Sequence, residues 1–336
     1  MKKTYSQERI TLKDHVPLEK PLSIFIEPTN VCTFQCVFCP IGLENYKTEV
    51  GGKFYLNLKM FKKIIMMIKD DFEKVKRLNF YVLGEPFANK NIFEFVKIAK
   101  DLDIAENLVI VTNGSLLSKD KYQKILDSGL DFLVISIYGH NEESFKELTR
   151  SKYSFVQIIK NVGGFISFRN ANNKEKPVVV ASIFFDNNTY RLIEILENIV
   201  DEIWTQHIID WMEEEGKFTS KVQNANLGFP KQNFKTCGAA FYQMVIHSDL
   251  KVSICCNDWK KRLVIGDLRL ERPREIWNGQ KATWIRRAIL KNGYKAIEAC
   301  KHCITPQFQS QKDSLDDVSE DTFLKRLKEW YNINAD

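Results

Sequence analysis

The chain has 336 residues, of which 44% are hydrophobic and 27% are charged, the composition of an ordinary globular protein. Its net charge of +6 is small and scattered, so it gives no argument for a nucleic-acid partner. No apolar run approaches the roughly 20 residues that cross a bilayer, and the N-terminus M-K-K-T-Y-S-Q-E-R-I lacks the apolar stretch of a secretory signal. We therefore expect a cytoplasmic chain with reduced thiols and no membrane partner.

Strand-like and helix-like segments alternate from residue 22 to about residue 210. Apolar runs predict strands at 22–27, 78–82, 107–112, 132–137, 178–184 and 202–208. The intervening segments predict helices at 58–69, 92–99, 119–128, 142–149, 155–168 and 190–199. Such alternation predicts an α/β fold with parallel strands and crossover helices. The pattern stops at six units, two fewer than a complete eight-fold barrel.

The character of the sequence changes after residue 210. Residues 212–228 are polar and predict a linker. Residues 241–255 predict a β-hairpin that turns at Ser248 and Asp249. A helix is predicted from 275 to about 290, and an amphipathic helix at 322–331.

Three cysteines, Cys32, Cys36 and Cys39, follow the first predicted strand in V-C-T-F-Q-C-V-F-C-P. Three thiolates can hold three irons of a [4Fe–4S] cluster and leave the fourth iron open to a substrate or cofactor. Structural zinc usually takes four ligands, and no fourth Cys or His lies nearby in the sequence. The spacing therefore favours an iron–sulfur site that takes part in chemistry.

A second set comprises four cysteines, at the end of the predicted hairpin and in a C-x2-C pair: Cys237, Cys255, Cys300 and Cys303. Four thiolates suit zinc and a [4Fe–4S] cluster about equally, so both remain open on chemistry alone. Neighbouring residues of a strand point to opposite faces. We therefore favour Cys255 as the ligand and expect Cys256 to be a small buried hydrophobic residue.

Over most of its length the chain resembles the radical S-adenosylmethionine (radical SAM) superfamily. The arrangement C-x3-C-x2-aromatic-C at residues 32–39 is that family's signature, and the resemblance implies that Phe38 lies near the adenine of S-adenosylmethionine. The segment Y-V-L-G-E-P looks like the family's G-G-E-P motif with a leucine at its first glycine. It implies that Gly84, Glu85 and Pro86 hold the methionine amino group.

Two further segments resemble the family's motifs in the expected order. V-T-N-G matches the family's T-N-G after the third strand, although Asn113 and Gly114 alone indicate only a turn. S-I-Y-G followed by Arg150 resembles S-[IL]-D-G…R, in which Ser136 and Arg150 would contact the ribose or carboxylate of S-adenosylmethionine. Arg150 by itself is typical of a helix surface. Tyr138 replaces the usual aspartate, which implies a role toward the substrate.

The C-terminal part resembles the twitch and SPASM extensions of this superfamily, and its cysteine spacing is similar to that of the radical SAM dehydrogenases of aminoglycoside biosynthesis. The resemblance implies a partial (β/α)6 TIM-like barrel at 1–215. It also implies a small α+β domain with a β-hairpin and one auxiliary [4Fe–4S] cluster at 230–310, and a C-terminal helical segment at 315–336.

The resemblance implies reductive cleavage of S-adenosylmethionine and removal of a substrate hydrogen by the 5′-deoxyadenosyl radical. The first hypothesis is oxidation of a secondary alcohol of a sugar or cyclitol, with the auxiliary cluster as electron acceptor. Tyr138, Asp186 and His207 lie near predicted strand ends and are candidates to bind hydroxyls or take the proton, although each also fits a structural role. The implied partners are a small-molecule substrate and a reductase such as flavodoxin or ferredoxin.

Two alternatives remain. Modification of a ribosomal precursor peptide is the second hypothesis; the roughly 20 residues before the first predicted strand are too few for a leader-binding domain. The third is a non-catalytic protein that carries electrons through two clusters or binds zinc, which leaves the G-E-P, T-N-G and S-I-Y-G segments without a purpose. We see no N-terminal α/β domain of the cobalamin-binding type.

Overall fold

The computed structural model describes residues 10–214, 216–226 and 229–331. Its strands are β1 (Ser23–Ile26), β2 (Val75–Asn79), β3 (Ala105–Thr112), β4 (Phe132–Ser136), β5 (Val178–Phe184), β6 (Glu202–Gln206), β7 (Gln243–Ile246), β8 (Lys251–Ser253) and β9 (Val264–Asp267). Its α-helices are α1 (Tyr46–Glu49), α2 (Leu58–Phe72), α3 (Ile92–Asp101), α4 (Lys119–Asp127), α5 (Glu142–Thr149), α6 (Phe155–Ala171), α7 (Thr189–Leu196), α8 (Ala239–Tyr242), α9 (Pro273–Trp277), α10 (Gln280–Asn292) and α11 (Glu320–Tyr331).

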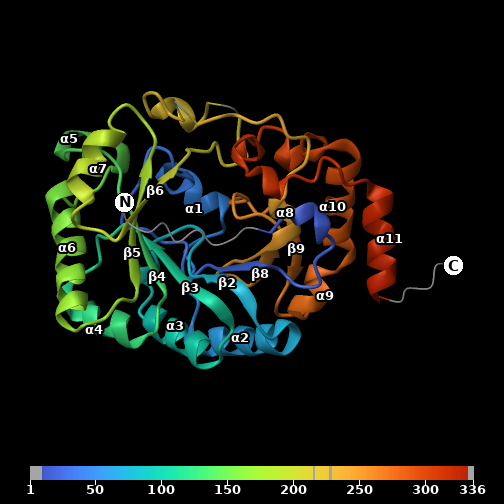
Figure 1. Cartoon of the computed structure of the whole chain (residues 1–336), viewed down its shortest axis with the longest axis horizontal. Coiled ribbons are helices and arrows are strands. Elements are labelled where there is room, and N and C mark those ends of the chain that lie inside the picture. Colours follow the sequence, from blue (N-terminus) through green and yellow to red (C-terminus); the bar gives the residue numbers. More distant parts are fainter. Residues whose placement is uncertain (1–9, 215, 227–228, 332–336) are drawn as a thin grey trace.

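One sheet runs through the described chain in the order β6-β5-β4-β3-β2-β1-β7-β8-β9. Every pair from β6 to β7 is parallel. Helices α2, α3, α4, α6 and α7 lie along the outside of the curved sheet, and the C-terminal helices gather at its other side (Figure 1). This arrangement confirms the α/β class with a partial parallel barrel, because crossover helices return each chain segment to the same strand direction.

The C-terminal strands extend the barrel sheet and do not form a separate sheet. Strand β7 pairs in parallel with β1, with Ile26 opposite Ile246, and the predicted hairpin follows as antiparallel β7 and β8. The loop after β1, which carries the first cysteine set, therefore starts beside the strands that lead to the second set.

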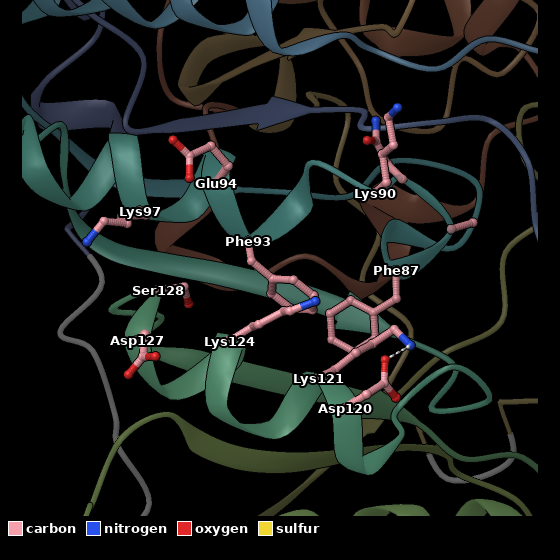
Figure 2. Close-up of a pocket in the computed structure, with 12 residues that line it drawn as sticks. Phe87, Lys90, Phe93, Glu94, Lys97, Asp120, Lys121, Lys124, Asp127 and Ser128 are labelled. Atoms are coloured by element: carbon pink, nitrogen blue, oxygen red, sulfur yellow. Dashed lines mark hydrogen bonds and ion pairs between the residues drawn. The ribbon is translucent and has the colours of Figure 1, made fainter.

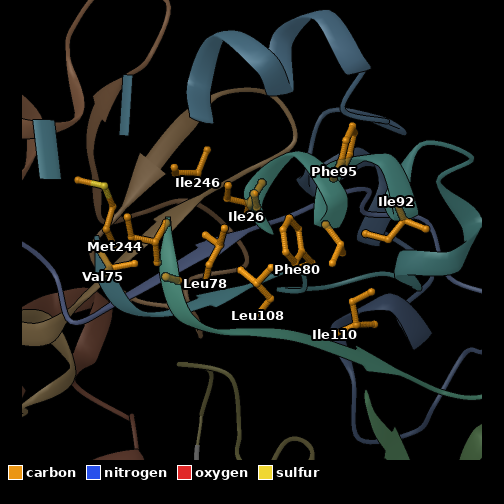
Figure 3. Packing of buried hydrophobic residues seen from close by; sticks show 14 of the residues in the cluster. Ile26, Val75, Leu78, Phe80, Ile92, Phe95, Leu108, Ile110, Met244 and Ile246 are labelled. Atoms are coloured by element: carbon orange, nitrogen blue, oxygen red, sulfur yellow. The ribbon is translucent and has the colours of Figure 1, made fainter. Parts of the chain in front are cut away.

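The core lies between the parallel strands and the helices that cover them. Figure 3 shows side chains of β1, β2, β3 and β7 packed with those of α3. In α3 the buried residues are Ile92, Phe95, Val96 and Ala99. Their spacing of three and four residues gives the helix one apolar face, so the helix lies flat on the sheet and leaves its charged residues outside.

The structure differs from the sequence prediction in three places. The helix predicted from 275 to 290 is two helices, because Gly279 takes an extended ψ of 164° as the N-cap of α10. The second strand ends at Asn79 and not at 82, since the chain then turns toward Gly84, whose φ is +80°. The predicted linker is folded around Asp210, which accepts hydrogen bonds from the backbone of Phe218 and Thr219. In the part of the chain that the structure describes, no helix has the length and apolarity needed to traverse a bilayer.

Candidate functional site

The first cysteine set lies in the loop that leaves the carboxyl end of β1. The backbone N–H of Gln35 bonds the carbonyl of Thr149 at 3.1 Å, and that of Val37 bonds Leu148 at 2.9 Å, so the end of α5 holds this loop. Burial raises the pKa of the Cys32 and Cys39 thiols to about 12. Thiols in this environment ionise when a cationic metal compensates their charge.

The G-E-P segment lies directly against the start of the cysteine loop. The Glu85 backbone N–H bonds the Val31 carbonyl at 2.8 Å. A Cβ on Gly84 would stand 2.2 Å from the carbonyl oxygen of Thr29, so only glycine fits at this contact. The Glu85 side chain is buried and accepts hydrogen bonds from Thr112 Oγ1 and the N–H groups of Phe87 and Asn113. Burial raises its pKa, and these donors act in the opposite direction.

The T-N-G segment reaches the same loop from the end of β3. Asn113 Nδ2 donates to Thr33 Oγ1 at 3.0 Å and contacts Cys32 Sγ at 3.5 Å. Thr33 Oγ1 in turn lies 2.7 Å from Ser115 Oγ. The structure thus brings together the first cysteine, Glu85 and Asn113, three predicted site residues that the sequence places up to 81 positions apart. Thr33 and Ser115 were missed, because isolated hydroxyl residues carry no motif, and Thr112 belongs to T-N-G but was not assigned a role.

Phe38 lies in an aromatic group with two residues from later strand ends. Its ring centroid is 4.6 Å from those of Tyr138 and Phe184, both in edge-to-face geometry, and Tyr138 stacks on Phe184 at 4.4 Å. The Tyr138 hydroxyl accepts a hydrogen bond from Gln206 Nε2 at 3.2 Å. Burial raises the pKa of Tyr138, so the phenol stays protonated at neutral pH. Phe184 had no signal in the sequence beyond its place at a strand end.

Ser136 and Arg150 occupy different environments. Ser136 is the half-buried last residue of β4, opposite Ser182 of β5. Arg150 caps α5 in the left-handed conformation, with φ of 47° and an exposed side chain. Its backbone follows directly on Thr149, which supports the cysteine loop, so Arg150 lies at the rim of the site.

The structure brings Tyr138 and Asp186 to one small cavity and turns His207 elsewhere. His140, which the sequence analysis did not single out, lines the same cavity as Tyr138 and Asp186. Asp186 Oδ1 accepts the Asn188 N–H at 2.8 Å and shapes the turn after β5. The His207 ring packs on Phe308 at 4.4 Å, and burial lowers its pKa to about 4. Strand β6 ends at Gln206, so His207 lies in the segment beyond it, and the two side chains have different partners, Tyr138 and Phe308.

The second cysteine set converges in the C-terminal part. All eight cysteines of the chain are free thiols. The charge of Cys303 affects the pKa of Cys237, Cys255 and Cys300, although burial dominates for Cys237 and Cys300. The four predicted ligands, which come from three separate segments, thus lie within electrostatic range of one another.

The expected separation of Cys255 and Cys256 onto opposite faces is wrong. Strand β8 ends at Ser253, so both cysteines lie in the turn beyond it. The two thiols hydrogen-bond each other. This interaction raises the pKa of Cys255 and lowers the pKa of Cys256. Cys256 is close enough to influence the pKa of Cys303. Strand alternation therefore does not select the ligand from this pair.

Gln243, the first residue of β7, presents a buried amide to this group. Its side chain is 3% exposed, and its Nε2 has no hydrogen-bond partner among the described residues. The Gln243 amide is near enough to Cys256 to lower the pKa of that thiol. A buried donor beside several thiols fits a bound group with sulfur acceptors.

Both thiol sets fit iron–sulfur groups by the chemistry of their donors. They combine free thiols that are buried or half-buried and, at the second set, a buried amide donor without a hydrogen-bond partner among the described residues. In the described ranges, no three His, Cys, Asp or Glu side chains stand close enough to hold a single metal ion. The fit thus rests on donor type and shared location, and not on ligand distances.

An apolar cluster connects the surroundings of the two sets. Trp259, three residues after Cys256, stacks on Tyr46 at 5.9 Å, and Cys39 and Trp211 pack against the same cluster. Trp211 Nε1 donates to the Phe38 carbonyl at 2.9 Å. The segment after β6 therefore covers the cysteine loop and contacts the C-terminal part.

Family comparisons agree with this division of the site. Residues 26–167 match the Radical SAM superfamily, and residues 237–304 match SPASM, an iron–sulfur cluster-binding domain. An uncharacterised protein of Methanocaldococcus jannaschii is 27% identical over 62% of this chain, which spans 64% of that relative's length. A PqqA peptide cyclase of Bradyrhizobium diazoefficiens is 26% identical to this chain. The similarity covers 54% of this chain and 44% of the cyclase. The chain thus spans less than two thirds of the length of each of these two relatives.

Two further similarities cover nearly the whole of the related chain. The S-adenosyl-L-methionine-dependent 2-deoxy-scyllo-inosamine dehydrogenase of Niallia circulans is 21% identical over 86% of this chain and 95% of its own length. The crystal structure of BtrN with AdoMet and 2-DOIA superposes with a TM-score of 0.60 at 19% identity, over 86% of this chain and 95% of that one. The fold, the two thiol sets and the family matches together place this chain in the radical SAM superfamily, with a C-terminal SPASM-type iron–sulfur cluster-binding domain.

Proposed function

We propose that this chain is a radical SAM oxidoreductase that converts a secondary alcohol of a sugar or cyclitol to a ketone. The observation that carries the proposal is a second set of cysteines, within residues 237–304 that match an iron–sulfur cluster-binding domain, in the same chain as the S-adenosylmethionine motifs. A second cluster suits a reaction that must remove an electron from the substrate. The similarity to a cyclitol amine dehydrogenase along almost its entire length supports an alcohol as substrate.

The cofactors are S-adenosylmethionine and two [4Fe–4S] clusters. Cys32, Cys36 and Cys39 would hold the first cluster, and Cys237, Cys300 and Cys303 with a cysteine of the 255–256 pair would hold the second. When bound, the first cluster supplies the electron that cleaves S-adenosylmethionine to a radical able to take a hydrogen atom, and the second supplies an electron acceptor.

The residues around the cysteine loop would bind and orient the cofactor. Glu85 fixes the G-E-P loop to the end of β3, so the backbone of this loop stays in place beside Cys32. Gly84 keeps the close approach that a side chain would prevent. Ser136 at the end of β4 and Arg150 at the rim would supply polar groups to the ribose or carboxylate.

The aromatic group would exclude water from the reacting atoms. Phe38, Tyr138 and Phe184 form a continuous apolar wall, and a radical reaction needs such a wall because unwanted donors nearby would be attacked. The Tyr138 phenol, protonated at neutral pH, would donate a hydrogen bond to a substrate hydroxyl.

Asp186 and His207 are the candidates to accept the proton of the substrate hydroxyl. Asp186 shares a cavity with Tyr138 and His140, which favours it by position. His207 is neutral at physiological pH because burial lowers its pKa to about 4, but its ring faces Phe308. We therefore propose Asp186, before His207, as the residue that accepts the proton of the substrate hydroxyl.

The test is a product analysis under anaerobic conditions. Reduced protein is incubated with candidate amino-cyclitols and sugars, and one S-adenosylmethionine should be consumed per ketone formed. Cleavage of S-adenosylmethionine without any oxidised product would refute the dehydrogenase. Iron analysis gives an independent check: about 8 irons per chain, falling to about 4 when Cys32, Cys36 and Cys39 are replaced by alanine.

Peptide modification is the second candidate, favoured by the similarity to a PqqA peptide cyclase. That similarity covers 44% of the cyclase, compared with 95% of the dehydrogenase. Formation of a modified residue in a small peptide encoded beside the gene, without oxidation of any alcohol, would select this function.

A further inference from the structure

A second feature of the C-terminal part is a basic pocket beside the second thiol set. The pocket has a volume of about 670 Å³ and is lined by Lys231, Lys235, Lys291 and Lys295, with Asp316 as its one carboxylate. All four lysines are exposed. The Glu320 carboxylate lies 3.7 Å from Lys291 Nζ. Among the described residues, no carboxylate forms an ion pair with the other three lysines.

Asp316 is a single carboxylate against four lysines, so the pocket keeps an excess of positive charge. The Asp316 carboxylate accepts the backbone N–H of Lys235 at 3.1 Å and that of Thr236 at 2.8 Å, as well as the Thr236 hydroxyl at 2.7 Å. These bonds fix the segment that carries Lys235. The pocket thus presents an excess of positive charge on a rigid wall, which suits a partner of negative charge.

Both walls of the pocket lead directly to predicted cluster ligands. Lys235 precedes Cys237 by two residues, and its carbonyl accepts the Tyr294 N–H at 2.9 Å. The opposite wall continues from Tyr294 to Cys300, whose N–H bonds Ile297 at 2.8 Å. A protein seated on these lysines would therefore lie near the second thiol set.

We infer that this pocket docks an acidic one-electron carrier protein of the flavodoxin type, which takes up the electron that the substrate leaves on the second cluster. The inference rests on the proposed function, because alcohol oxidation delivers one electron to that cluster in each turnover. The electron balance is simple: the second cluster is oxidised by one electron and the flavin of the carrier is reduced by one.

The cavity between α3 and α4 provides a contrast. Figure 2 shows Lys90, Lys97, Lys121 and Lys124 there, together with Glu94, Asp120 and Asp127. Lys121 pairs with Asp120 at 3.4 Å. The charges in this cavity nearly cancel, so we expect no acidic protein to be steered to it.

The experiment measures binding of oxidised flavodoxin to the cluster-loaded full chain by titration calorimetry. The variant Lys235→Glu/Lys295→Glu should weaken binding at least tenfold at low salt, and the difference should shrink at high salt. The matched control is Lys97→Glu/Lys124→Glu, which makes the same change of charge in the other cavity and should bind like wild type. Circular dichroism and iron content would show that both variants are folded and loaded.

A second measurement follows reduction of the second cluster. Flavodoxin hydroquinone should reduce it at least tenfold more slowly in the Lys235/Lys295 variant, whereas photoreduced deazaflavin, a small neutral reductant, should act equally on all proteins. Equal loss of binding in the control variant, or binding insensitive to both changes, would overturn the inference. So would binding of pyrophosphate in this pocket without binding of flavodoxin, which would make it a small-anion site. Failure to oxidise any alcohol, with flavodoxin binding intact, would refute the proposed function and leave the docking site standing.

Discussion

The carboxylate of Glu85 accepts a hydrogen bond of 2.6 Å from the hydroxyl of Thr112 and thereby joins the G-E-P loop to the end of β3. The same carboxylate accepts the Asn113 N–H at 2.8 Å, and Asn113 in turn contacts Cys32. Three motifs thus form one polar network around a buried acid. Because every donor in it is buried or half-buried, loss of the acid leaves several groups unsatisfied.

Glu85→Ala should lower the free energy of unfolding by about 2–4 kcal/mol, because the Thr112 hydroxyl and two backbone N–H groups lose their acceptor. Thermal unfolding of the metal-free chain under anaerobic conditions measures this effect. Thr112→Ser keeps the hydroxyl and should cost about 1 kcal/mol or less. An unchanged melting temperature for Glu85→Ala would contradict the network.

Tyr138→Phe should preserve folding but impair substrate use. The change keeps the ring that packs on Phe38 and Phe184 and removes the hydroxyl that accepts from Gln206, so stability should fall by about 1 kcal/mol. If the phenol binds the substrate, KM should rise while cleavage of S-adenosylmethionine without substrate stays as in wild type. Tyr138→Ala removes the ring as well and should cost about 3–5 kcal/mol.

The His207 side chain should make the fold sensitive to mild acid. Its pKa is lowered from 6.5 to about 4 in the folded chain, so above pH 6.5 the ring is neutral in both states and contributes no pH dependence. As the pH falls from 6.5 to 4, His207 binds a proton in the unfolded chain but stays neutral in the folded chain. The free energy of unfolding therefore falls by up to about 3 kcal/mol. His207→Phe keeps the packing on Phe308 and should lose less stability over this window. Identical pH profiles for the two proteins would contradict the assignment.

Gln243→Leu should make the second cluster harder to reduce. A donor to a cluster sulfur stabilises the more negative, reduced state, and the Gln243 amide is buried without another partner. We expect the equilibrium constant of the one-electron reduction to fall by up to tenfold, or about 59 mV. Redox titration followed by electron paramagnetic resonance measures it. Gln243→His, which keeps an N–H donor, should restore part of the shift.

Cys255→Ser and Cys256→Ser distinguish the two neighbouring thiols. We keep Cys255 as the expected ligand, so Cys255→Ser should lower the iron content by about 4 per chain, while Cys256→Ser should leave it near 8. Anaerobic iron and sulfide analysis measures both. The opposite result would make Cys256 the ligand, which the turn geometry allows because the two thiols touch.

The sequence by itself determined the parallel α/β architecture, the hairpin and the position of each motif. These features depend on local periodicity and on short spacings: α5 spans Glu142–Thr149 as its pattern predicts, and the cysteines of residues 32–39 share one loop whatever the rest of the chain does. Helix and strand ends were less exact, as at α9 and α10, because one residue with an extended ψ divides a continuous helical pattern.

Only the tertiary structure decided which distant side chains meet. The bond from the Thr112 hydroxyl to Glu85 and the aromatic group of Phe38, Tyr138 and Phe184 join segments far apart in sequence, and the fold places the buried Gln243 amide near Cys256. It also turned His207 toward Phe308 and brought Cys256 into contact with Cys255. Such contacts depend on strand register and on the path of each loop, which no local pattern encodes, because a shift of one residue sends a side chain to the opposite face.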